Sequence, residues 1–202
     1  MDTKKVIKVP FSKEDIKDLK AGDYVYLTGI LYSARDAAHK RMYDGIMESG
    51  CLDKDGKELF ESGILPLDIT GNAFYYLGPT PAKPGQVIGS AGPTTSSRMD
   101  KYAPLLLDKG LLGMIGKGKR NREVIDAIVR NKAVYMAAVG GAGALLSKCI
   151  KESEVIAYDD LGTEAIRKMR VENFPVVVVI DSEGNNLYET AVEDYRKQTG
   201  TV

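Results

Sequence analysis

The sequence predicts an α/β domain with a mixed sheet flanked by helices, and three observations support that prediction. The first third of the chain is rich in strand-forming residues, and the remainder alternates between strand and helix patterns. The apolar run at 175–181 is typical of a strand buried on both faces. The 202 residues contain no internal repeat and no low-complexity linker. We therefore expect one domain over 1–202, with a loose polar tail over about 190–202.

The first half of the chain predicts two helices and three strands. Apolar residues at helical spacing, or a serine before a polar run, mark the helices. Aromatic and β-branched residues mark the strands, and prolines and glycines mark the connections. The expected elements are helices over 13–20 and 34–50, strands over 24–32, 67–69 and 73–77, and a short strand or turn at 86–88.

The second half predicts a regular alternation of the two element types. Apolar runs end at glycines or polar pairs, and amphipathic segments follow them. The expected elements are helices over 99–110, 121–131, 140–151 and 163–170, and strands over 113–118, 133–139, 155–158 and 175–181.

Composition excludes several classes of protein. Acidic and basic side chains number 28 each, so bulk charge does not favour nucleic-acid binding. No apolar run has membrane-spanning length, and the first ten residues lack the apolar region of a signal peptide. We therefore expect a cytoplasmic protein that binds neither nucleic acid nor membrane.

Cysteine and histidine are scarce. The two cysteines, Cys51 and Cys149, are far apart and lack a Cys-x-x-Cys partner, which disfavours a disulfide framework or a zinc ribbon. An iron–sulfur cluster normally needs three or four thiolates, so this chain cannot hold one alone. His39 is the only histidine, which excludes a multi-histidine metal site within the chain. No metal ligand is expected here.

The segment 89–100 carries the strongest local signal. Small residues precede four consecutive hydroxyl side chains at 94–97, and Arg98 follows them. A small-residue loop that begins a helix offers free N–H groups and a positive dipole end to an anion. The hydroxyls and the guanidinium add further donors. The segment therefore predicts a small-anion site, with an ordinary capped helix start as the alternative.

A second glycine-rich segment allows three interpretations. Along residues 133–160, the sequence predicts a strand, glycines at 140–143, a helix, a strand and an acidic pair, in the order of a dinucleotide-binding unit. Leu146 stands where that signature requires Gly or Ala, so the spacing fails. The other interpretations are a tight turn with close helix packing, and glycines that border a substrate pocket beside the hydroxyls.

Four motifs occur in one order: Ala-Arg-Asp-Ala-Ala-His at 34–39, Gly-Ser-Ala-Gly-Pro-Thr-Thr-Ser-Ser-Arg-Met-Asp at 89–100, Met-Ile-Gly-Lys-Gly at 114–118 and Ala-Ala-Val-Gly-Gly-Ala-Gly-Ala-Leu at 137–145. Together they resemble the class I fumarate hydratase and tartrate dehydratase family, specifically its β subunit or C-terminal domain. The resemblance covers about 10–190 and implies a swivelling-type β/β/α layered domain.

The resemblance implies a hydro-lyase of C4 dicarboxylates, with fumarate to malate as the expected reaction and L(+)-tartrate dehydration as the alternative. In this family the 4Fe–4S cluster belongs to the α part, which agrees with the two cysteines of this chain. An iron–sulfur α subunit, a homo- or hetero-oligomer and a requirement for that partner are therefore implied. Functions of other classes are a non-catalytic nucleotide- or anion-binding domain using 140–143, or a structural interaction module.

The resemblance also implies residue roles. Two substrate carboxylates call for fixed cations, and arginine suits bidentate binding. A threonine hydroxyl is a very weak base, so a catalytic Thr94 needs positive surroundings; alternatively, it orients the substrate while another group takes the proton. Thr95 and Ser96 either bind a carboxylate or cap the helix. The implied set is Thr94 as catalytic residue, Arg35, Thr95, Ser96, Arg98 and Lys117 as substrate ligands, and Asp36, His39, Gly140 and Gly141 as supporting residues.

Overall fold

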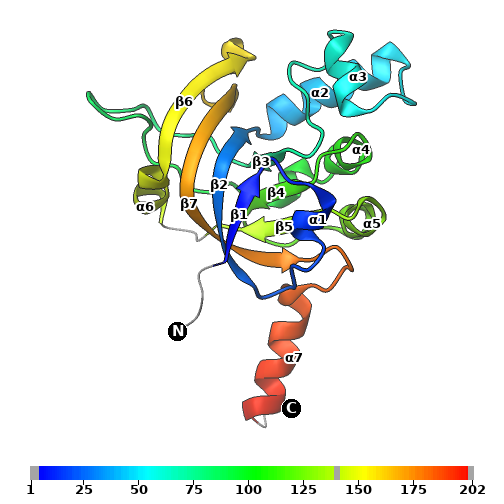
Figure 1. The fold of residues 1–202 in the computed structure, drawn as a ribbon, viewed down its shortest axis with the longest axis vertical. Helices are drawn as coiled ribbons and strands as arrows, with labels where there is room; N and C mark the ends of the chain where they lie inside the picture. Colours follow the sequence, from blue (N-terminus) through cyan, green and yellow to red (C-terminus); the bar gives the residue numbers. More distant parts are fainter. Residues whose placement is uncertain (1–4, 139–141, 200–202) are drawn as a thin grey trace.

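The computed structural model describes residues 5–138 and 142–199 (Figure 1). The strands are β1 (Val6–Val9), β2 (Tyr24–Ser33), β3 (Ala73–Tyr75), β4 (Gly113–Gly116), β5 (Val134–Ala137), β6 (Ile150–Ala157) and β7 (Ile166–Ile180). The α-helices are α1 (Lys13–Ile16), α2 (Asp36–Ser49), α3 (Gly56–Glu61), α4 (Ala103–Asp108), α5 (Arg122–Asn131), α6 (Gly143–Cys149) and α7 (Leu187–Thr199). Two 3-10 helices, η1 (Ser96–Met99) and η2 (Asp159–Glu164), complete the described elements.

The described strands form one mixed sheet in the order β1-β2-β3-β4-β5-β7-β6. Strands β1 to β5 pair in parallel with one another, whereas β7 runs antiparallel to β2, β5 and β6. Because β7 pairs with both β2 and β5, the strands β2, β3, β4, β5 and β7 close a ring of pairings. The α/β fold and mixed sheet expected from the sequence are thereby confirmed.

Helices cover the sheet and bury its apolar side chains. In Figure 1, α2, α4 and α5 lie on one side of the curved sheet, and α6 lies beside β6 and β7. Helix α5 shows why such a segment folds: Asn121 caps its first turn by accepting a hydrogen bond from the Val124 N–H at 3.0 Å. Val124 and Ile128 are fully buried, which fixes this helix to the core.

Three expected elements are wrong. The helix expected over 163–170 is largely strand, since β7 begins at Ile166 and pairs with β2 and β6. The helix expected over 99–110 is divided into η1 and α4, because Pro104 lacks an N–H and disfavours helical backbone before it. No strand forms over 67–69, where the backbone turns toward β3 instead.

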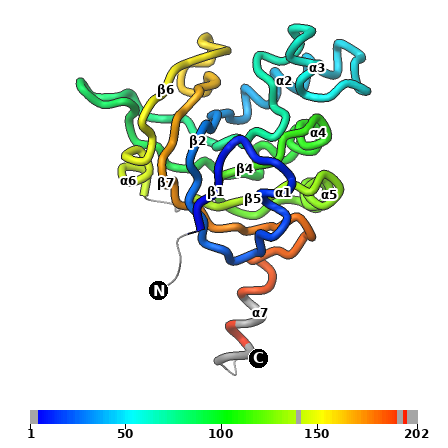
Figure 2. The backbone as a smooth tube through the Cα atoms, in the orientation of Figure 1, coloured from blue at the N-terminus to red at the C-terminus, as the bar shows by residue number. Residues whose placement is uncertain are grey.

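Two segments extend away from the sheet: helix α7 and the connection between β3 and η1. Residues 190–199, expected as a loose tail, continue α7, which leads away from the sheet (Figure 1). The segment between β3 and η1 reaches outward past β6 and β7 (Figure 2).

Among the described residues, every helix is too short or too polar to cross a membrane.

Candidate functional site

The expected site residues follow the carboxyl ends of neighbouring parallel strands. Arg35 comes two residues after β2, Tyr76 directly after β3, and Lys117 directly after β4. The parallel registers of β2 with β3 and of β3 with β4 bring these ends to one edge of the sheet. Ligands of α/β proteins commonly bind at this edge.

Residues 94–98, called here the hydroxyl segment, lie along the extension of β4. The Thr94 N–H donates to the Tyr76 carbonyl at 2.7 Å, and the Ser96 N–H donates to the Lys117 carbonyl at 2.8 Å. The Lys117 N–H donates in return to the Thr94 carbonyl at 3.3 Å. This bridge pairs Thr95 with Lys117 in parallel, so residues far apart in sequence become neighbours.

Four charged residues form a second group, the rim cluster: Arg35, Asp36, Arg98 and Glu164. Asp36 lies 2.6 Å from Arg98 Nη2 and 3.5 Å from Arg35 Nη2, so both guanidinium groups share one carboxylate. Glu164 lies 3.0 Å from Arg35 Nη2, and its other oxygen accepts from the Ala37 N–H at 3.1 Å. The structure therefore brings the guanidinium groups of Arg35 and Arg98 to the same side of the molecule.

The residues of this candidate site differ in solvent exposure. The side chain of Arg98 is 47% exposed, whereas that of Arg35 is 17% exposed. Thr95 and Lys117 are exposed, and Thr94 is partly buried. Within the described part of the chain, Lys117 has no ion-pair partner. The exposed cations and hydroxyls can thus meet an anion from solvent.

Ser96 does not fit the expected substrate contact. Its side chain is fully buried, and its Oγ lies 2.8 Å from the Tyr135 Oη. The Tyr135 hydroxyl donates its proton to the Gly118 carbonyl at 2.8 Å, so Ser96 must be the donor to Tyr135. Ser96 therefore ties the hydroxyl segment to the core. Thr95, the residue before η1, makes no capping bond with its side chain.

The expected helix dipole is also missing from the site. Residues 96–98 of the hydroxyl segment belong to η1, a 3-10 helix of four residues, instead of the first turn of a long helix. Positive charge here comes from Arg35, Arg98 and Lys117, because a single short turn sums few peptide dipoles.

His39 is buried beneath the rim cluster. Its Nδ1 lies 2.9 Å from the Arg35 carbonyl, which can only accept, so Nδ1 carries the proton. The ring packs edge-on against Phe74 and Tyr76, at centroid distances of 5.5 and 5.2 Å. Burial lowers the pKa of His39 to about 4, which keeps the imidazole neutral. A side chain without solvent exposure supports the site only through its neighbours.

The glycine-rich segment lies partly outside the description, since Gly140 and Gly141 are not among the described residues. Gly143, which begins α6, accepts a hydrogen bond from the Ala91 N–H at 3.0 Å, and a Cβ there would overlap Ser90 Oγ. The strand after α6 pairs antiparallel with β7 and is not adjacent to β5. This arrangement lacks the parallel crossover of a dinucleotide site and places Gly143 beside the segment that leads to Thr94.

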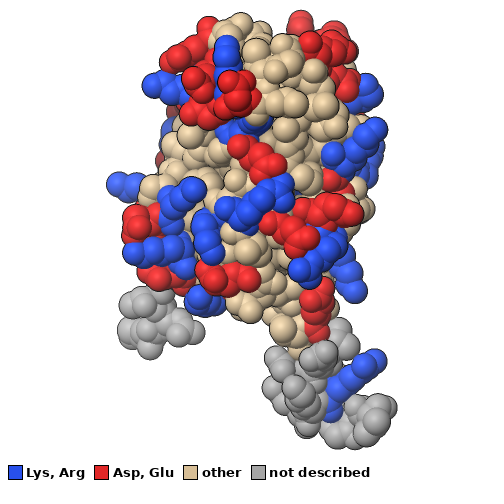
Figure 3. All heavy atoms as spheres, turned by 90° about the vertical axis from the view of Figure 1, so that its right-hand side faces the viewer, with Lys and Arg blue, Asp and Glu red and all other residues tan. Residues whose placement is uncertain are grey.

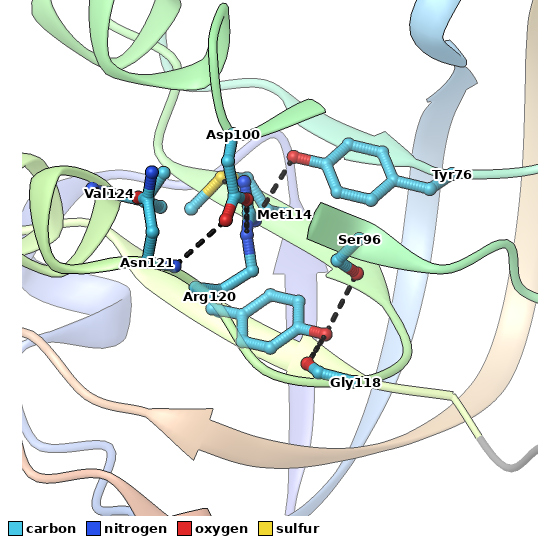
Figure 4. Close-up of polar contacts among 9 residues, drawn as sticks. Tyr76, Ser96, Asp100, Met114, Gly118, Arg120, Asn121 and Val124 are labelled. Carbon is cyan, nitrogen blue, oxygen red and sulfur yellow. Dashed lines mark hydrogen bonds and ion pairs between the residues drawn. The ribbon is translucent and has the colours of Figure 1, made fainter. Parts of the chain in front are cut away.

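A buried group that the sequence did not reveal lies under the hydroxyl segment (Figure 4). Arg120 is fully buried, and its Nε donates to Asp100 at 2.6 Å. The other Asp100 oxygen accepts from the Asn121 N–H at 2.8 Å. The guanidinium carbon lies 5.5 Å from the Tyr76 ring centre and 5.1 Å from that of Tyr135. We call Asp100, Arg120, Tyr76 and Tyr135 the buried anchor.

Little in the sequence could have identified these residues. Asp100 closes the 89–100 motif, which was a usable signal, but Arg120 stands in an ordinary basic stretch. Glu164 was hidden because its surroundings were expected to be helix. Only the sheet register brings each of them to its partner.

A cavity of about 440 Å³ opens next to the rim cluster. Its wall includes Thr163, which precedes Glu164, and Pro79, which follows the glycine beside Arg35. The described residues contain no group of three or more His, Cys, Asp and Glu side chains suited to a metal ion.

The fold and the candidate site define an α/β domain that gathers arginines and hydroxyls at the carboxyl ends of the parallel strands of a mixed sheet. The chain belongs to the family described as Fumarase C-terminus, whose model matches residues 2–191. The family resemblance predicted from the four motifs is therefore confirmed.

Relatives differ in how much of their length this chain covers. It is 37% identical to the anaerobic class I fumarate hydratase of Escherichia coli and 34% identical to fumarate hydratase 2 of Leishmania major. These matches cover 82% and 90% of the chain, but only 28% and 30% of the relatives. A Methanocaldococcus jannaschii protein assigned as an L(+)-tartrate dehydratase subunit beta is 36% identical, with 88% of each chain covered.

Proposed function

We propose that this chain is the β part of a two-part hydro-lyase that reversibly adds water to a C4 dicarboxylate, with fumarate as the first candidate. The observation that carries the proposal is the meeting of Arg35 and Arg98 on one carboxylate beside Thr94, Thr95 and Lys117. A dicarboxylate needs cations at two ends and donors between them, which this edge supplies.

Each residue then has a definite task. Arg98 and Lys117, which are exposed, bind substrate carboxylate groups, and Arg35 contributes the less exposed cation. Thr95 donates a hydrogen bond to a carboxylate oxygen. Asp36 holds the two guanidinium groups together and yields Arg98 to the incoming substrate.

Thr94 is proposed to handle the proton on the reacting carbon or to orient that carbon. Its hydroxyl is a weak base, so proton removal requires neighbouring positive charge to stabilise the alkoxide. Arg98 belongs to the same hydroxyl segment, and the Lys117 N–H donates to the Thr94 carbonyl at 3.3 Å. We therefore propose these two cations as the source of that positive charge.

This chain does not suit an iron–sulfur cluster by itself. A cluster needs three or four thiolates, and the sequence has only Cys51 and Cys149. We propose that the cluster is carried by an α subunit, and no step described here runs through it. The tartrate dehydratase subunit beta relative, matched over 88% of its length, supports a separate partner chain.

The first experiment compares the chain alone with the chain co-purified with its iron–sulfur partner. We expect fumarate hydration, followed by loss of fumarate absorbance, only in the assembled protein. Hydration by the isolated chain without iron would refute the two-part assignment. An assembled, iron-loaded protein that acts on neither fumarate nor tartrate would refute the reaction class.

The second experiment tests Thr94. In the assembled protein, Thr94→Ser keeps the hydroxyl and should retain partial activity, whereas Thr94→Ala should lose about 100-fold or more in kcat. Thr95→Ala is the matched control and should mainly raise KM, because Thr95 binds without handling the proton. Equal kcat for Thr94→Ala and wild type would remove Thr94 from the chemistry.

L(+)-tartrate is the second candidate substrate. The relative assigned as an L(+)-tartrate dehydratase subunit beta, 36% identical with 88% of each chain covered, supports it. The ratio of kcat/KM for fumarate, malate and tartrate decides between the two substrates.

A further inference from the structure

We propose that the buried Arg120–Asp100 pair is a positioning device that fixes the hydroxyl segment against β4. The expected effect on catalysis rests on the proposed function. Its structural consequence can be measured on the chain alone.

The pair connects a rigid helix to the hydroxyl segment. Asp100 is the residue after η1 and uses both oxygens, one for Arg120 Nε at 2.6 Å and one for the Asn121 N–H at 2.8 Å. Asn121 is in turn the N-cap of α5, whose apolar face is buried. The negative charge of Asp100 at the start of this helix is also electrostatically favourable.

A second tie lies at the other side of the same segment. Ser96 donates to the Tyr135 hydroxyl, and Tyr135 donates to the Gly118 carbonyl, each at 2.8 Å. Figure 4 shows Ser96, Arg120 and Gly118 around this contact. Tyr76 links the buried pair to Thr94, because its carbonyl accepts the Thr94 N–H at 2.7 Å and its hydroxyl accepts from Arg120 Nη1 at 3.3 Å. The segment bearing Thr94 is thus held at both ends.

The energetics favour a positioning role over simple stabilisation. Burial of an ion pair removes water from two charges, and apolar side chains of similar volume often serve stability equally well. In addition, Arg120 Nη2 has no hydrogen-bond partner among the described residues although it is buried. An apolar residue cannot supply the directional hydrogen bond that fixes the position of Asp100. That position in turn fixes the register of residues 94–98 against β4.

The chain offers a matched control in the pair Arg130–Asp108. These residues join α5 to α4 through two hydrogen bonds of 2.7 Å, from Arg130 Nε and Nη2. Their side chains are 46% and 38% exposed, and neither contacts the hydroxyl segment. The same substitutions there change an Arg–Asp pair without touching the site.

The first test is hydrogen exchange on the chain alone. In Arg120→Lys, which keeps the charge but loses the planar fork, exchange of the Thr94 and Ser96 amides should accelerate by about tenfold or more. Amides of β2 and α2 should be unaffected, and Arg130→Lys should leave all of these unchanged. Unaltered exchange at 94 and 96, or an even acceleration through the whole chain, would overturn the proposal.

The second test uses the assembled protein. In Arg120→Lys, kcat should fall about tenfold, while KM rises less than about threefold because Glu164 holds Arg35 independently. Asp100→Asn should give a similar loss, and the double variant should lose little more than either single change. Additive losses would show that the two residues do not act as a pair and would contradict the proposal.

Asp100→Asn covers the case in which Arg120→Lys fails to fold. It keeps the shape of the side chain but weakens the contacts with Arg120 and the Asn121 N–H, so exchange at Thr94 and Ser96 should accelerate about threefold or more without global unfolding. Unchanged exchange at both amides in this folded variant would overturn the proposal. If the wild-type assembly lacks hydro-lyase activity, the proposed function fails, and hydrogen exchange still decides the positioning role.

Discussion

The rim cluster and the buried anchor both pair arginine with aspartate, yet they occupy opposite environments. Arg98 is 47% exposed and shares Asp36 with Arg35. Arg120 is fully buried and shares Asp100 with a backbone N–H. The two arrangements lie on the two sides of the hydroxyl segment, one facing solvent and the other facing the core.

The difference in burial suits the two Arg–Asp pairs to two different roles. Water and ions compete with an exposed pair, so an incoming carboxylate of the proposed substrate would replace Asp36 at modest cost. A buried pair resists exchange, because breaking it leaves a charge in a medium of low dielectric constant. The solvent side can therefore bind and release ligand, while the core side keeps its geometry. Figure 3 shows that exposed charges of both signs are interspersed on one face, as ordinary surface pairs are.

The largest expected effect is on stability and separates buried from exposed pairs. Arg120→Ala leaves Asp100 buried without its cation and should lower the free energy of unfolding by about 3–5 kcal/mol. Arg130→Ala should lower it by less than about 1 kcal/mol, since that pair is screened by water. Urea unfolding of both variants measures the contrast, and equal losses would abolish the distinction.

Lowering the pH should lower the free energy of unfolding, because His39 is buried in its neutral form. The folded pKa is about 4, below the unfolded value near 6.5, so protons bind the unfolded chain first as the pH falls. Stability should therefore decline between about pH 6.5 and 4, by about 3 kcal/mol in total.

Urea unfolding at several pH values measures that decline. His39 is the only histidine, so His39→Gln should flatten the dependence above about pH 5, where carboxylates contribute little. An identical slope in His39→Gln would assign the effect to other groups.

On the solvent side, Arg98→Ala should act on catalysis and leave the fold intact. In the assembled protein kcat/KM should fall about 100-fold, because a charged contact with a substrate carboxylate is lost. Arg122→Ala, which removes an arginine that is 80% exposed and pairs along α5, is the control. If Arg98→Ala retains wild-type turnover and affinity, Arg98 does not bind substrate.

The smallest expected effect concerns the placement of Arg35. A Cβ at Gly78 would lie 2.6 Å from Arg35 Nη1, so Gly78→Ala should shift the guanidinium. We expect KM to rise about fivefold, equivalent to about 1 kcal/mol, with little change in stability. Gly45→Ala, within α2 and with only ordinary contacts, should leave KM unchanged.

Much of this molecule was predictable because its signals are local. The motif 89–100 contains the segment that reaches the candidate site, and Arg35, Arg98 and Lys117, which the sequence also singled out, lie near it; their roles remain a prediction. The strand at β2 and the helix at α5 followed from side-chain periodicity. The helix prediction for 163–170 was wrong because this mixture of charged and apolar residues suits a helix or a strand, and pairing with β2 and β6 decided for strand.

By itself, the sequence determined the family, the fold class and the identity of the residues that carry charge and hydroxyls, since these depend on residue type and spacing. Tertiary structure decided which of them face solvent. Ser96 turned inward to Tyr135, and Glu164 and Asp100 acquired arginine partners from distant segments. The physical reason is that burial and charge pairing depend on sheet register, which sets neighbours across the chain and has no signature in any one segment.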